Sequence, residues 1–211
     1  MIDVAVVHGQ SAAIGSLPHA DPVEAAAFAL EVQPRLPAAP SLPNRSAREG
    51  MIAQAAWGIP GVEVLPDGSL RVDDPRLDPL APVDGSVDGD PFVGLRAFLA
   101  AAAGRIGPLK VQLTGPVTLG LALHACGVDA ERAFPLAGAA VRARAAALVQ
   151  AVRRAAPLAP LVAFVDEPGL VGAMHPGFPL DPDATLDLVS SALATLEPHA
   201  VTGLHCCGAA D

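Results

Sequence analysis

The chain has 211 residues, and 22 acidic against 13 basic residues give it a formal net charge of −9. That charge argues against broad binding of nucleic acids or of anionic membranes, because both require a basic protein surface. Hydrophobic residues make up 52% of the sequence but aromatic residues only 3%, so we expect one sizeable core built mostly of Ala, Val and Leu.

The first half of the chain alternates short apolar runs with helical segments. A first strand is expected within residues 4–8 or 12–16. Asp21 before Pro22, with Glu24 following, is typical of a helix N-terminus and predicts a helix over 22–33. The next expected elements are a short extended piece near Ser41, a helix at 46–57, a hairpin of 62–66 with 70–72, a loop at 73–90 and a helix at 91–103.

The second half repeats the order of strand and helix. Strands are expected at 109–113, 161–165 and 201–206, and helices at 117–125, 130–155 and 183–197. Strands that alternate with helices predict an α/β domain with a parallel sheet.

Polar residues directly follow these strands: Ser16, Thr114, Asp166, Glu167 and His205. A (β/α)₈ TIM-type barrel carries its active site at that end of the strands, and a doubly wound sheet also binds ligands there. We favour the barrel because no glycine-rich phosphate-binding turn follows the first strand. A closed barrel takes about 250 residues and eight strands. Residues 1–211 are therefore expected to form the N-terminal part of one barrel, truncated after about five strands.

The pair His205 and Cys207 is the sharpest chemical signal in the sequence. In an extended segment these two side chains share one face, and zinc accepts both types of ligand. The alternative is a buried strand end with small apolar cysteines. The sequence has three cysteines, Cys126, Cys206 and Cys207, and the last two are adjacent. An odd number with an adjacent pair favours free thiols or metal ligands over disulfides.

Asp166 and Glu167 close an apolar strand, where buried carboxylates would need partners. Asp166 fits a cationic group such as the amine of an amino acid, while the alternative is a solvated loop that caps the next turn. Ser16 could hold a carboxylate at a helix start, or it could cap that helix. Thr114 similarly belongs to a binding site or to a simple strand-to-helix turn.

Taken in order, four segments resemble the catalytic domain of the cobalamin-independent methionine synthase family, in the superfamily of uroporphyrinogen decarboxylase. The segments are Ile14-Gly15-Ser16-Leu17-Pro18, Leu113-Thr114-Gly115-Pro116, Val165-Asp166-Glu167-Pro168 and His205-Cys206-Cys207-Gly208. The resemblance implies a (β/α)₈ barrel and a Zn²⁺-dependent methyltransferase of methionine biosynthesis, which transfers a methyl group to a thiol such as homocysteine.

The resemblance also implies roles for single residues. His205 and Cys207 would bind the metal, Asp166 would bind the amino group of homocysteine, and Ser16 would lie near its carboxylate. We thus predict Asp166 and Glu167 as catalytic residues and Ser16, Thr114 and Asp166 as substrate-binding residues. The partners would be a small thiol and a methyl donor, without nucleic acid or membrane.

Two other hypotheses remain open. A metal-free lyase of the decarboxylase branch would need arginines near the first strand, where Arg45 and Arg48 are the candidates. A non-catalytic truncated barrel would expose open sheet edges, which favour a homo-oligomer. The segment 1–4 lacks the basic region of a signal peptide, and no apolar run reaches the roughly 18 residues of a membrane span. We therefore expect a cytoplasmic protein.

Overall fold

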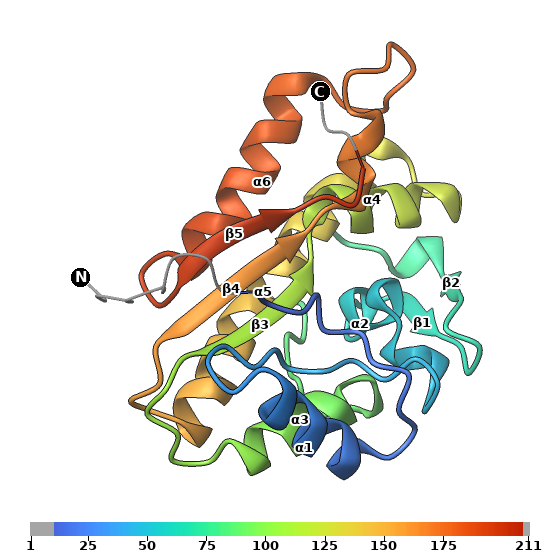
Figure 1. The fold of residues 1–211 in the computed structure, drawn as a ribbon. Coiled ribbons are helices and arrows are strands. Elements are labelled where there is room, and N and C mark those ends of the chain that lie inside the picture. Colours follow the sequence, from blue (N-terminus) through green and yellow to red (C-terminus); the bar gives the residue numbers. More distant parts are fainter. Residues whose placement is uncertain (1–10, 209–211) are drawn as a thin grey trace.

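The computed structural model describes residues 11–208, which form a parallel sheet backed by helices and a separate antiparallel strand pair (Figure 1). The strand predicted at 4–8 lies outside the described residues. The parallel sheet has the order β3-β4-β5 and consists of β3 (Leu109–Thr114), β4 (Leu161–Asp166) and β5 (Val201–His205). The antiparallel pair consists of β1 (Val62–Val64) and β2 (Leu70–Val72), as the hairpin prediction stated.

The helices follow the predicted order closely. They are α1 (Pro22–Val32), α2 (Met51–Ala56), α3 (Val93–Ala101), α4 (Pro116–Ala125), α5 (Ala130–Ala155) and α6 (Pro182–Leu196). Asp21 caps α1, because its Oδ1 accepts hydrogen bonds from the backbone N–H groups of Val23 and Glu24 at 2.7 and 2.9 Å. The helix predicted at 46–57 is instead divided at Gly50, whose ψ of 150° is extended and separates a short 3₁₀ turn (Ala47–Glu49) from α2.

Two irregular segments continue the parallel arrangement beside β3. Ser16 forms a parallel bridge with Ser41, and Ala38 forms one with Lys110. The backbone N–H of Leu17 donates to the carbonyl of Ser41 at 3.0 Å. The segment at 37–43 contains three prolines, which have no N–H to donate, so the bridges do not extend into a continuous ladder.

The prediction of a (β/α)₈ barrel is wrong for the described residues. Their strands form a three-stranded parallel sheet and a separate two-stranded pair, and no barrel closes in this part of the chain. Barrels and open sheets share the alternation of strands with helices. That pattern therefore predicts parallel pairing correctly, but it does not determine whether a sheet closes on itself.

The main core lies between the sheet and its helices. Leu109, Val111 and Leu113 alternate along β3 and are buried, and the matching residues of β4 do the same. The intervening residues on β3 are Lys110, Gln112 and Thr114, which pair with Val162, Phe164 and Asp166 on β4. The opposite face of the sheet, called the polar face below, therefore carries these polar side chains beside two apolar ones. No described helix combines the length and the apolar character needed to cross a membrane.

Candidate functional site

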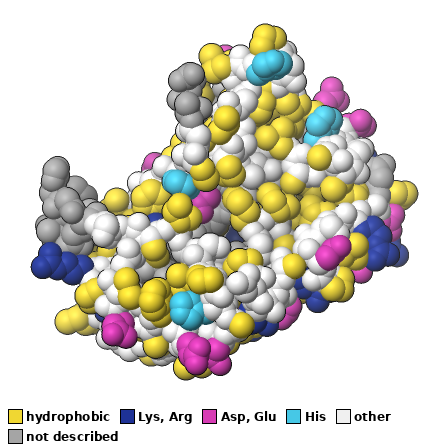
Figure 2. Space-filling view, turned by 45° about the vertical axis from the view of Figure 1, so that its right-hand side comes forward, with side chains coloured by type: hydrophobic (Ala, Val, Ile, Leu, Met, Phe, Trp, Pro, Cys, Tyr) yellow, Lys and Arg dark blue, Asp and Glu magenta, His cyan; other side chains and the backbone are white. Residues whose placement is uncertain are grey.

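Three predicted site residues meet at the carboxyl ends of the parallel strands. Thr114 on β3 pairs in register with Asp166 on β4, which pairs with His205 on β5. Directly paired residues project from the same face of a sheet, so the three side chains form one row on the polar face. Figure 2 shows that the molecular surface is hollowed near its middle, with hydrophobic, histidine and acidic side chains around the hollow.

Asp166 is the charged group in this row with unused bonding capacity. Within residues 11–208, no donor forms a hydrogen bond with its carboxylate, which is only partly exposed. Burial raises the pKa of Asp166, while Lys110 and His205 oppose that shift through their positive charge. The carboxylate is therefore positioned to receive a cation or a hydrogen-bond donor from a ligand.

Lys110 is a site residue that the sequence interpretation missed. Its Nζ donates to the backbone carbonyl of Ile14 at 3.1 Å and to Oε1 of Gln112 at 3.2 Å, and it lies 4.9 Å from the centre of the Phe164 ring. Burial lowers the pKa of Lys110 to about 8, against the opposing attraction of Asp166. A lysine that alternates with apolar residues along β3, two positions before Gln112, was the signal available in the sequence.

Glu167 lies next to this row but serves the fold. Its side chain is fully buried and accepts hydrogen bonds from the backbone N–H groups of Val117 and Thr118 at 2.8 and 2.7 Å. The hydroxyl of Thr118 adds a third bond at 2.6 Å. Burial raises the pKa of Glu167, and these hydrogen bonds oppose the shift. Glu167 thus caps α4 from the position directly after β4, and its oxygens already accept hydrogen bonds.

Thr114 is likewise engaged by the chain itself. Its hydroxyl donates to the backbone carbonyl of Met51 at 2.8 Å, which ties the end of β3 to the start of α2. Only the remaining lone pairs of this hydroxyl are left for a ligand.

Ser16 lies beside Ser41 rather than in the polar row. The two hydroxyl oxygens are 3.3 Å apart on the exposed surface. Gln112 holds the adjoining segments in place, because its Nε2 donates to the carbonyl of Ala39 at 2.6 Å. Gly15 has a φ of +129°, and a Cβ there would lie 2.0 Å from the same Nε2, so this close approach requires glycine.

The zinc prediction is contradicted by the geometry. The Nε2 of His205 lies 3.5 Å from the Sγ of Cys207, so the expected pair does form. Among the described residues, however, no group of three or more His, Cys, Asp or Glu side chains could hold a metal ion. A catalytic zinc needs three protein ligands, and a short His-x-Cys motif supplies only two. Cys126, Cys206 and Cys207 are all free thiols.

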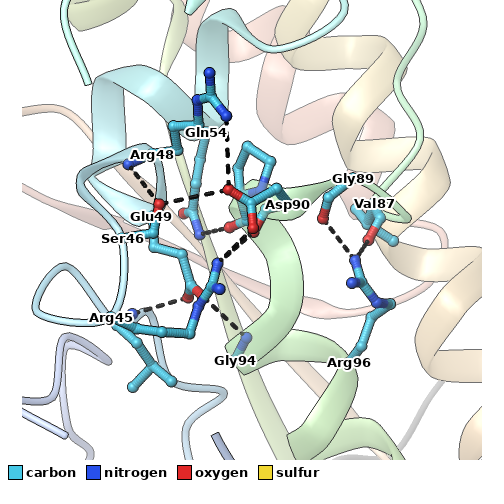
Figure 3. Close-up of polar contacts among 12 residues, drawn as sticks. Arg45, Ser46, Arg48, Glu49, Gln54, Val87, Gly89, Asp90, Gly94 and Arg96 are labelled. Carbon is cyan, nitrogen blue, oxygen red and sulfur yellow. Dashed lines mark hydrogen bonds and ion pairs between the residues drawn. The ribbon is translucent and has the colours of Figure 1, made fainter. Parts of the chain in front are cut away.

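Arg45 and Arg48 form ion pairs with acidic residues of the chain (Figure 3). The Nε of Arg45 lies 2.5 Å from Oε1 of Glu49, and its Nη2 lies 3.0 Å from Oδ1 of Asp90. Arg48 lies 4.0 Å from the other oxygen of Asp90. Glu49 is fully buried, and burial raises its pKa against the pull of Arg45. These ion pairs connect the two arginines to the fold around α2.

Comparison of the sequence with protein-family models gives no match, and comparison with curated proteins gives none either. The geometry of the polar row and the four motifs are therefore the features that indicate a function.

Proposed function

We propose that the chain binds an amino acid carrying a thiol, such as homocysteine, and takes part in methyl transfer to that thiol. The carboxylate of Asp166, which has no hydrogen-bond donor in the described structure, carries this proposal. An ammonium group would supply charge-assisted hydrogen bonds to it. The position of Asp166 at the carboxyl ends of parallel strands, where α/β proteins bind ligands, supports the same conclusion.

The reaction requires a base as well as a binding site. When a methyl group moves to a thiol, the sulfur forms a bond to the methyl carbon, the bond between that carbon and the donor breaks, and the thiol proton must leave. His205 lies opposite Asp166 in the register of β4 and β5, and it is only partly buried. Its imidazole is our candidate for accepting the thiol proton, because a ring nitrogen can serve as a general base.

The proposal gives no catalytic role to Glu167 or Thr114. The side-chain hydrogen bonds of Glu167 all go to the N-terminus of α4, and the hydroxyl of Thr114 donates to the carbonyl of Met51. Both residues instead hold the strand ends that carry Asp166.

Calorimetric titration with L-homocysteine tests the proposal. A hydrogen bond to a charged group contributes about 1.5–3 kcal/mol, so Asp166→Asn should weaken binding by roughly 10- to 100-fold. Asp187→Asn, an exposed aspartate on α6, is the matched control and should bind like the wild type. A wild-type chain that does not bind homocysteine, or an Asp166→Asn variant with unchanged affinity, would refute the proposal.

A further inference from the structure

The polar face of the sheet carries a cation and an anion that do not neutralise each other by contact. Lys110 on β3 and Asp166 on β4 belong to the same face of adjacent strands, since Lys110 pairs with Val162 and Thr114 with Asp166. Each affects the ionisation of the other, yet Lys110 forms no ion pair with any described carboxylate. The two charges are near enough to interact and far enough apart to leave bonding capacity on both.

The ammonium of Lys110 has one N–H beyond those that its two acceptors engage. An ammonium group has three donors, and within residues 11–208 only the carbonyl of Ile14 and Oε1 of Gln112 accept from this one. Both acceptors are neutral, and the Lys110 residue is only 4% exposed. Because a buried charge without a counter-charge is costly, an anionic group from a ligand would offset that cost.

The neighbours of Lys110 keep its ammonium in place. Phe164, which pairs with Gln112, lies beside the ammonium at 4.9 Å. Gly203 pairs with Phe164 on the other side, and a Cβ at Gly203 would lie 2.6 Å from the Phe164 ring. The absence of a side chain at Gly203 therefore leaves room for the Phe164 ring, which lies over Gly203 and next to Lys110.

We propose that Lys110 binds the carboxylate of the amino acid whose ammonium group binds Asp166. An α-amino acid carries both charges on one carbon, so one zwitterion would engage both side chains. This inference rests on the proposed function and names a substrate-binding residue that is not among those predicted from the sequence. It also moves the carboxylate away from Ser16, whose exposed hydroxyl already faces Ser41.

Four ligands that differ by one group each test the inference in the full chain. They are L-homocysteine, 3-aminopropane-1-thiol without the carboxylate, 4-sulfanylbutanoic acid without the amine, and L-2-aminobutanoate without the thiol. The wild type should bind homocysteine at least tenfold more tightly than 3-aminopropane-1-thiol. Lys110→Met should remove that difference and leave the affinity for 3-aminopropane-1-thiol unchanged. Ser16→Ala, the control, should retain the difference.

The wild-type measurement needs no variant, so it decides the question even if Lys110→Met does not fold. Equal wild-type affinities for homocysteine and 3-aminopropane-1-thiol would overturn the inference, because the carboxylate would then go unrecognised. Discrimination that persists in a folded Lys110→Met variant would also overturn it and leave the binding of the amine by Asp166 standing. If L-2-aminobutanoate binds as tightly as homocysteine and depends on Lys110, the zwitterion site stands and the thiol-specific function fails. If neither amino acid binds, both proposals fail.

Discussion

Replacement of Glu167 by alanine tests whether α4 depends on a cap supplied by the residue that directly follows β4. The side chain of Glu167 is fully buried, and it accepts bonds from the N–H groups of Val117 and Thr118 and from the Thr118 hydroxyl. Glu167→Ala leaves two buried backbone donors without an acceptor. Each such donor costs about 1–3 kcal/mol, so the free energy of unfolding should fall by about 4 kcal/mol.

Glu167→Gln should have a smaller effect than Glu167→Ala. The amide keeps one acceptor oxygen, and it removes the cost of burying a charge, the same cost that raises the pKa of Glu167. We expect a loss of about 1–2 kcal/mol from the exchange of one charged acceptor for a neutral one.

Urea unfolding followed by circular dichroism measures both variants. Glu197→Ala is the control, because this side chain is exposed at the C-terminus of α6 and should change stability by less than about 0.5 kcal/mol. The reasoning is refuted if Glu167→Ala unfolds within about 1 kcal/mol of the wild type. It is also refuted if alanine and glutamine have equal effects.

Three further predictions concern stability. Burial lowers the pKa of Lys110 from 10.5 to about 8, so the unfolded chain holds more protons than the folded chain between these pH values. The free energy of unfolding, measured in urea titrations, should therefore rise by up to about 3 kcal/mol from pH 8 to pH 10.5. Lys110→Met should abolish this rise. Gly115→Ala would place a Cβ 2.2 Å from Oε1 of Glu167, so it should cost about 2 kcal/mol of stability and lower the thermal midpoint. Gly172→Ala is the control and should leave the midpoint unchanged, because the nearest atom to its Cβ would be 3.7 Å away. Arg45→Met removes the cation that pairs with the buried carboxylate of Glu49, so the free energy of unfolding in denaturant should fall by about 3 kcal/mol. Arg71→Met breaks an exposed ion pair and should have little effect, so a comparable loss in that variant would contradict this reasoning.

Local signals in the sequence predicted most of the elements. Asp21 caps α1 and a proline begins this helix, so its predicted start follows from nearest-neighbour chemistry. The strands β3, β4 and β5 were recognised from short apolar runs, and the row formed by Thr114, Asp166 and His205 followed from their parallel order. The helix start and the individual strands depend on residues close together in the chain, which is why sequence alone revealed them.

Tertiary structure decided the remaining features, because they depend on residues far apart in sequence. The cap that Glu167 supplies to α4 spans 49 and 50 positions, and the contact between Lys110 and Ile14 spans 96. No local pattern indicates that one buried carboxylate is fully bonded while its neighbour Asp166 is not. Closure of the sheet and completion of a metal site are also properties of the whole arrangement. The sequence therefore determined which polar residues reach the strand ends, and packing determined which of them are left to bind a ligand.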